Sequence, residues 1–355
     1  MSTTMKVLLI GVVCLLAVAL ADARAASQRL GDFDGDDDQP RFKFFVFGDS
    51  YADTGNEPKS SELTGRTHGW YYPYGCTDDA HDRQPTDRLS NGLIEPDFIA
   101  PRAEGLRREN GVDPSGMNFA VGGAVVYEDA LFKAKKTPPE RSTLVSQVGT
   151  FSQLLIAGVI DGDLADSVAL IAFSDGRDYF VNGTITDSQV VSMTRDVTNT
   201  IAEAVVRLQD MGVSRVMVNT LPPMGCTPWD TVQNNYTDCV SPDNVIPLYH
   251  NMFLRHKLSD AKGVLLLDYH AVFTDIIHTP GSGRWTQFWH KYTPCCANTE
   301  PDGFCGQKDD DDNDLYTLCS NPNQYFYWDS MHLSEAGHKA VIGVLEDKIK
   351  NFLEI

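Results

Sequence analysis

The sequence predicts an α/β protein in which helices cover both faces of a central parallel sheet. Apolar runs of strand length alternate along the chain with segments whose apolar residues recur every three or four positions. This alternation is typical of βαβ units, whose crossover helices bury the parallel strands that they connect. The chain has 355 residues and shows no internal repeat or long linker, so we expect one domain with a large core, over residues 42–355.

Four apolar runs are the predicted strands. The first, residues 44–47, holds only aromatic and β-branched residues, as a strand buried on both faces does, and it stops at Gly48. The later runs are residues 168–173, 213–218 and 264–267. Parallel strands end at a common edge of the sheet, and this edge is where open α/β sheets bind ligands.

Two segments between and after these strands are predicted helices. Residues 189–211 place apolar side chains three or four positions apart, which gives the helix one apolar face. A last helix is expected from Glu335 to Leu353, with the Ser334 hydroxyl as its N-terminal cap. His338 lies within this helix, and we expect it at the surface.

The candidate catalytic residues come from opposite ends of the chain. Ser50 follows the first strand in a Gly-Asp-Ser tripeptide, which by itself is also an ordinary turn sequence. A serine hydroxyl becomes a good nucleophile when a histidine takes its proton and a carboxylate orients that histidine. Asp329 and His332, three residues apart, can supply both groups, and the other eight histidines show no such pairing. No Gly-x-Ser-x-Gly motif occurs, which excludes the nucleophile elbow of α/β-hydrolases.

The N-terminus has the features of a secretory signal peptide, which we place at residues 1–25. A short basic start precedes an apolar run over residues 7–20, and small residues follow at a possible cleavage site. A membrane anchor is the alternative, but the run is short for crossing a bilayer, and no other stretch of the chain could do so. Residues 26–41 are acidic and read as a flexible leader. We therefore expect the secretory pathway, with the extracellular space or apoplast as destination and the Golgi lumen as the alternative.

Charge and cysteine content agree with a secreted protein. The net charge of −20 disfavours nucleic acid and anionic membranes as partners. Asn182 and Asn235 begin glycosylation sequons. Of eight cysteines, Cys14 lies in the signal peptide, and the other seven predict three disulfides with one thiol free or paired between chains. Cys226 and Cys239 flank a short loop and are the expected pair; zinc is the rival interpretation, but no Cys-x-x-Cys occurs.

Five ordered motifs resemble those of the plant GDSL esterases and lipases, a branch of the SGNH hydrolases. They are FGDSYADTGN (47–56), RLSNG (88–92), GMNFAVGGA (116–124), LPPMGCTP (221–228) and WDSMH (328–332). The resemblance covers nearly the whole mature chain. It implies a three-layer α/β/α, flavodoxin-like fold and ester hydrolysis through an acyl-enzyme, without a metal or an organic cofactor.

The resemblance also implies a role for each candidate residue. Ser50 is the nucleophile, His332 the base and Asp329 its orienting carboxylate. The backbone N–H groups of Ser50 and Gly123, with an Asn side chain, form the oxyanion hole. Arg177 stands where the family has that Asn; it can donate to an oxyanion, or it can pair at the surface with a neighbouring aspartate.

The expected substrates are lipid esters or acetyl esters of cell-wall polysaccharide. Two alternatives stay open. The same acyl-enzyme could pass its acyl group to an alcohol, which would make the protein an acyltransferase. The fold could also serve a non-catalytic protein that binds a glycan or a lipid. The sequence leaves the oligomeric state undetermined.

Overall fold

The fold was analysed in a computed structural model of the chain. It describes residues 43–100, 116–127, 142–179, 186–279, 285–300 and 303–354. The predicted signal peptide, the acidic leader and the Asn182 sequon lie outside the described residues and stay predictions. Among the described residues, no helix has both the length and the apolar character that crossing a membrane requires.

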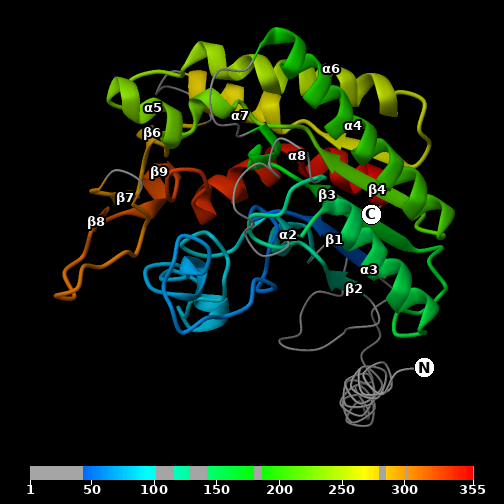
Figure 1. Cartoon of the computed structure of the whole chain (residues 1–355), viewed down its shortest axis with the longest axis horizontal. Coiled ribbons are helices and arrows are strands. Elements are labelled where there is room, and N and C mark those ends of the chain that lie inside the picture. Colours follow the sequence, from blue (N-terminus) through cyan, green and yellow to red (C-terminus); the bar gives the residue numbers. More distant parts are fainter. Residues whose placement is uncertain are drawn as a thin grey trace, which may run out of the picture.

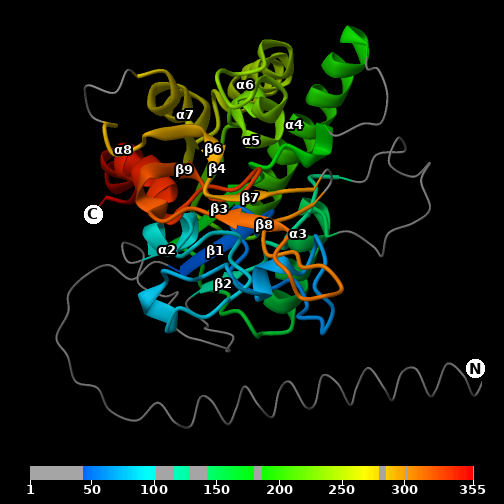
Figure 2. The same cartoon turned by 90° about the vertical axis from the view of Figure 1, so that its left-hand side faces the viewer.

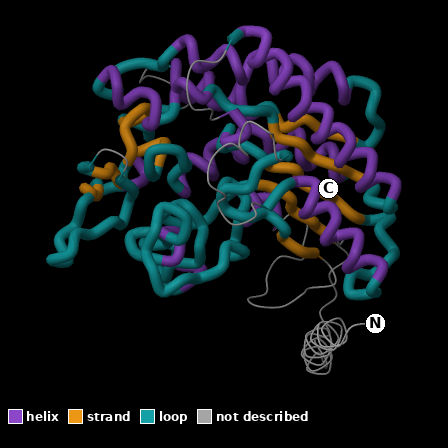
Figure 3. The backbone as a smooth tube through the Cα atoms, in the orientation of Figure 1, coloured by secondary structure: helices purple, strands orange, loops and turns teal. Residues whose placement is uncertain are grey.

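Five parallel strands form the central sheet (Figure 1, Figure 3). Their spatial order is β2-β1-β3-β4-β5, and every neighbouring pair is parallel. This is the flavodoxin-like order, which confirms the predicted fold class. The strands are β1 (Lys43–Gly48), β2 (Gly116–Asn118), β3 (Ser167–Ala172), β4 (Arg215–Asn219) and β5 (Val264–Leu267).

Helices cover both faces of this sheet and complete three layers (Figure 2). One face carries α3 (Leu144–Ile156), α4 (Asp187–Asp210) and α6 (Val245–Leu258); the other carries α2 (Glu95–Ile99), α7 (Tyr269–His278) and α8 (Glu335–Leu353). A short helix, α5 (Pro228–Thr231), lies beyond the sheet. Single turns of 3₁₀ helix occur at His68–Trp70, Asp79–His81, Arg177–Tyr179, Met224–Cys226, Val232–Asn234, Ser241–Asn244 and Pro322–Gln324.

The side chains of β1 show why the sheet is buried on both faces. Phe44 and Val46 join the core under α2, α7 and α8, whereas Phe45 and Phe47 join the core under α3, α4 and α6. This alternation follows from the two-residue period of a strand. Because each face meets a helical layer, both sets must be apolar, which produces the unbroken run seen in the sequence.

The predicted helix ends agree closely with the structure. The Ser334 hydroxyl accepts a hydrogen bond from the Gly337 N–H at 3.0 Å, and α8 runs over the predicted residues. Helix α4 begins two residues before its predicted start, at Asp187, because the Thr186 side chain caps it.

A cysteine-rich extension lies beside the sheet, before the last helix. In it β6 (His290–Pro294) pairs in parallel with β9 (Tyr325–Tyr327), and β7 (Cys296–Asn298) pairs with β8 (Tyr316–Leu318) in antiparallel fashion. Three disulfides form among the described residues, as predicted, and Cys76 is free. They join Cys226 to Cys239, Cys295 to Cys319 and Cys296 to Cys305.

Gly48 ends β1 at a position that admits no side chain. A Cβ there would collide with the backbone carbonyl of Ala172 on the neighbouring strand. We expect Gly48→Ala to lower the free energy of unfolding by about 1–3 kcal/mol, the usual cost of overpacking. Gly343→Ala is the control, because Gly343 lies on the exposed side of helix α8 and its Cβ would meet nothing within 4 Å. This variant should raise the free energy of unfolding by up to about 1 kcal/mol. Urea unfolding measures both, and equal stabilities would contradict this explanation.

Candidate active site

Three buried side chains form a hydrogen-bonded chain at the carboxyl end of β1. Ser50 Oγ lies 2.8 Å from His332 Nε2, and His332 Nδ1 lies 2.8 Å from Asp329 Oδ2. Ser50 follows β1, and Asp329 follows β9. The fold thus brings together the three residues that the sequence singled out. This order of hydroxyl, imidazole and carboxylate can move a proton off the serine oxygen.

The Asp329 carboxylate is held as an anion by donors from two parts of the chain. Its Oδ1 accepts from the N–H groups of Met331 and His332, each at 2.8 Å, and its Oδ2 accepts from the Tyr74 hydroxyl at 2.8 Å. Burial raises the pKa of Asp329, but the nearby His332, then His68 and the Met331 N–H, outweigh it and lower the pKa to about 2. Asp329 therefore stays charged across the range in which a histidine titrates.

Asp49 fixes the backbone next to Ser50. Its Oδ1 accepts from the Tyr51 N–H at 2.9 Å, and its Oδ2 accepts from Ser174 N–H at 2.6 Å and Asp175 N–H at 2.9 Å. Burial and the neighbouring Asp175 raise the pKa of Asp49 well above its ordinary value, while the three N–H donors oppose that rise. This carboxylate ties the loop after β1 to the loop after β3. Sequence reasoning treated it as part of an ordinary turn.

Two further side chains bind the loops around Ser50. The Gln147 amide of α3 both accepts from the Gly48 N–H and donates to its carbonyl, each at 2.9 Å. Asp53 Oδ2 accepts from the Gly122 N–H at 2.6 Å, which places the Gly122–Gly123 turn beside the loop of the serine. Burial raises the pKa of Asp53 to about 6 despite these N–H donors.

Two backbone N–H groups remain available at this edge of the sheet. Within the described part of the chain, the N–H groups of Ser50 and Gly123 have no hydrogen-bond acceptor. Gly123 has a φ of +72°, which disfavours other residues, and a Cβ there would meet nothing within 4 Å. The glycine is therefore required by backbone conformation, and its surroundings are open.

Arg177 lies in the turn after β3, next to this loop. Its Nε is 3.3 Å from Asp175 Oδ2, and a third of its side chain is exposed. This ion pair is the pairing with a neighbouring aspartate that the sequence raised, but it is not at the surface, because the Asp175 side chain is only 2% exposed. No described residue accepts a hydrogen bond from its two terminal amino groups, so they are free to donate elsewhere.

The comparisons with known proteins identify the family. A model of the family "GDSL-like Lipase/Acylhydrolase" matches residues 44–343. The chain belongs to the GDSL lipases and acylhydrolases. It is a carboxylic ester hydrolase.

Curated plant relatives match over most of their length. One GDSL esterase/lipase of Arabidopsis thaliana is 33% identical over 85% of this chain and 85% of its own. Another is 29% identical over 88% and 95%, and a sinapine esterase of Brassica napus is 28% identical over 86% and 85%. Among solved structures, an α/β hydrolase from a metagenome of Lake Arreo, Spain, covers 71% of this chain and 87% of its own at 13% identity and a TM-score of 0.28, too low for a structural conclusion.

Two expectations about histidines in this GDSL protein were wrong. His338 is buried rather than exposed, with its ring 6.0 Å from that of Tyr51, because it belongs to the apolar stripe by which α8 packs on the core. Burial lowers the pKa of His338 to about 3, so it is neutral. His81 also has an aspartate three residues before it: its Nδ1 lies 2.8 Å from Asp78 Oδ2. In the described structure no serine is hydrogen bonded to His81, so this second pair lacks a nucleophile.

A narrow pocket adjoins the triad on one side. Tyr51 and Met331, the neighbours of Ser50 and His332, line it together with apolar groups of the loop after β4 and of α5; these are Pro222, Met224 and Trp229. Ser174, Asp175, Thr227 and Asp230 also line it, and its volume of about 10 Å³ is no more than one water molecule needs. The described residues offer one set of side chains close enough to bind a metal, Cys226, Cys239 and His278, but the two sulfurs are joined in a disulfide. They are therefore not thiolate ligands.

The Tyr74 hydroxyl gives a direct test of how Asp329 is held. Tyr74→Phe removes a donor to a buried carboxylate, so we expect it to lower the free energy of unfolding by about 1.5–3 kcal/mol at pH 7. Because the folded pKa of Asp329 is depressed, the loss should shrink as the pH falls from 3.8 toward about 2.

Tyr71→Phe is the matched control, since the Tyr71 hydroxyl donates to the neutral carbonyl of Ser60. This variant should lower the free energy of unfolding by only about 0.5–1.5 kcal/mol, and the loss should not depend on pH between 3.8 and about 2. Urea unfolding across pH measures both variants. If both variants lost the same free energy of unfolding at every pH, the Tyr74 hydrogen bond would not stabilise the charged form of Asp329.

Proposed function

We propose that the protein is a secreted serine esterase that forms an acyl-enzyme on Ser50. His332 acts as the base, and Asp329 orients its ring and stabilises the imidazolium. The observation that carries this proposal is the pair of 2.8 Å contacts that His332 makes, one through each ring nitrogen. The Asp329 contact leaves Nε2 as the nitrogen that accepts the serine proton.

The reaction follows from that geometry. As Ser50 Oγ attacks the ester carbonyl, its proton passes to His332 Nε2. The tetrahedral intermediate collapses, the C–O bond to the alcohol breaks, and His332 returns the proton to the departing alkoxide. Water then attacks the acyl-enzyme with His332 again as base, which releases the acid and restores the serine.

The negative oxygen of the intermediate needs donors that are already in place. The N–H groups of Ser50 and Gly123, which have no acceptor among the residues that the structure describes, are the proposed pair. We propose the Arg177 guanidinium as the third donor, in the position of the family's Asn. Its terminal amino groups, which have no acceptor among the described residues, support this role, whereas its Nε contact with Asp175 favours an ion pair alone.

Lipid esters and acetyl esters of cell-wall polysaccharide are the proposed substrate classes. The pocket beside Tyr51 is lined by both apolar and acidic side chains and has room for little more than a water molecule, so it favours neither class. A screen over acyl chain length, from activated acetyl to long-chain esters and acetylated xylan, would separate these classes. Repeating the screen with an added alcohol would reveal acyl transfer, the alternative outcome of the same acyl-enzyme. Three disulfides support export to an oxidising compartment.

Ser50→Ala and His332→Ala test the proposed mechanism. We expect each to remove nearly all ester hydrolysis while leaving the circular dichroism spectrum and thermal unfolding intact. Because members of a triad act as a unit, the double variant should be scarcely slower than either single one. Turnover of an activated acetyl ester measures all three variants. Wild-type turnover in Ser50→Ala would rule out the acyl-enzyme proposed here.

Arg177→Ala separates the two interpretations of that residue. Loss of an oxyanion donor typically lowers kcat by about 10²–10³ with little change in KM. Arg177→Asn should recover part of this loss, because Asn is the donor in the family motif. Steady-state kinetics on an activated ester measures both variants.

The contrary outcomes for Arg177 are distinct. If it is only the ion-pair partner of Asp175, kcat stays unchanged; because the Asp175 side chain is only 2% exposed, removing Arg177 leaves a buried carboxyl group unpaired and lowers the free energy of unfolding. Unchanged kinetics in Arg177→Ala would mean that the backbone N–H groups of Ser50 and Gly123 are enough to stabilise the oxyanion. A large rise in KM at unchanged kcat would make Arg177 a substrate-binding residue instead.

A further inference from the structure

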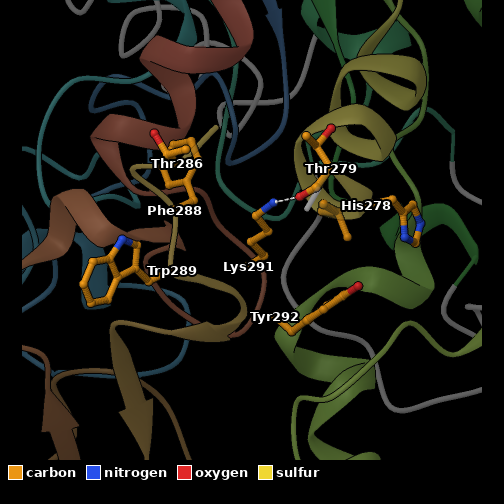
Figure 4. Close-up of a pocket in the computed structure, with 8 residues that line it drawn as sticks. His278, Thr279, Thr286, Phe288, Trp289, Lys291 and Tyr292 are labelled. Carbon is orange, nitrogen blue, oxygen red and sulfur yellow. Dashed lines mark hydrogen bonds between the residues drawn. The ribbon is translucent and has the colours of Figure 1, made fainter. Parts of the chain in front are cut away.

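A second hollow lies apart from the predicted catalytic residues, between the end of α7 and strand β6 (Figure 4). Its volume is about 540 Å³. Figure 4 shows Trp289 on one side of it, His278 and Tyr292 on the other, and the Lys291 side chain between them. None of these residues has a part in the proposed ester hydrolysis.

Trp289 is the unusual member of this hollow. Its side chain is 74% exposed, although tryptophan is among the residues that gain most from burial. Of the described tryptophans, only Trp289 and Trp229 are exposed. An exposed aromatic ring beside a hollow is a typical anchor for a ligand.

Polar groups line other parts of the hollow. The Lys291 ammonium donates to the carbonyl of Thr279 at 2.6 Å, which fixes it at the wall of the hollow and leaves two further N–H donors. The His278 imidazole and the Thr286 hydroxyl also line the hollow. Exposed aromatic surface is thus combined with hydrogen-bonding groups that point to different sides.

A sugar ring matches this combination, because it has an apolar C–H face and a rim of hydroxyl groups. His278 and Thr286 are exposed and Lys291 is half-buried, so these groups are accessible to the hydroxyls of a sugar, whereas an acyl chain would use none of them. Nucleic acid is disfavoured by the net charge of −20. We propose that this hollow binds a segment of a neutral polysaccharide, with a sugar stacked on Trp289.

The hollow is joined to the triad through short contacts. The Thr231 hydroxyl of α5 donates to the Tyr292 carbonyl at 3.1 Å, and Trp229 on the same helix lines the pocket beside Tyr51 and Met331. Strand β6, which carries Tyr292, pairs with β9, and β9 leads directly to Asp329. A polysaccharide held at Trp289 would therefore keep its ester groups near Ser50, a consequence that rests on the proposed function.

Binding is best tested with a probe that carries no ester. Deacetylated, uncharged arabinoxylan in a native gel should retard the full-length protein. We expect Trp289→Ala to weaken binding at least about tenfold, as loss of a central aromatic anchor does, and Trp289→Phe to retain most of it. Ile156→Ala is the control, because this side chain is 84% exposed at the end of α3 and lies outside the hollow. It should bind as the wild type does.

A second readout keeps this proposal apart from the proposed function. Trp289→Ala should leave kcat and KM on a small activated ester unchanged and should raise KM on acetylated xylan. In Ser50→Ala, arabinoxylan binding should persist although hydrolysis is lost. Hydrolysis that depends on Ser50, without retardation of the wild type, would overturn the polysaccharide site and leave the esterase mechanism standing. Binding to phosphatidylcholine vesicles that Trp289→Ala abolishes, without retardation by arabinoxylan, would assign the hollow to a lipid surface and also overturn the proposal.

Discussion

The buried carboxylate of Asp49 is the point on which the site depends. Three backbone N–H groups converge on it, from Tyr51 on one loop and from Ser174 and Asp175 on another. A buried carboxyl group without hydrogen-bond partners is costly in either protonation state, so the loops are bound to the one arrangement that supplies these donors. The same arrangement fixes the backbone of Ser50. The hydrogen bonds that order these two loops therefore also determine the position of Ser50.

The second half of the site is fixed from the other end of the chain. The Tyr51 hydroxyl donates to the Met331 carbonyl at 2.6 Å, and the Trp328 N–H donates to the His332 carbonyl at 2.7 Å. Just before this turn, Cys295 and Cys296 donate backbone hydrogen bonds to Tyr327 and Trp328. Each of these cysteines is in a disulfide, so the cysteine-rich extension holds the strand that delivers Asp329. We infer that the extension stabilises the positions of Asp329 and His332.

Patterns in short stretches of the sequence predicted those features that depend mainly on residues close together in the chain. The run at 44–47 had to be a strand because both its faces meet helices, and Ser334 had to cap α8 because its hydroxyl satisfies a free N–H. The partnership of Ser50 with His332 was predictable only because the chemistry of a serine nucleophile demands a base. The pairing of Cys226 with Cys239 was predictable from the short loop between them and from the expectation of secretion.

The supporting groups could not be predicted, because their partners are distant in sequence. Tyr74 reaches Asp329 across 255 positions, and Gln147 reaches Gly48 across 99. Neither has a local pattern that marks it. His338 was placed wrongly although the signal was present, since it lies on the apolar stripe of α8. Asp78 and His81 repeat the spacing of Asp329 and His332, and only the fold tells which pair faces a serine.

The central claim is that Ser50 is a nucleophile activated by His332. The most direct measurement is mass spectrometry after treatment with a phosphonate that labels activated serines. The account predicts one adduct per chain, on the peptide that contains Ser50, and almost none in His332→Ala. A protein that hydrolyses esters while its adduct lies on another serine, or while Ser50 is labelled equally well without His332, would contradict it.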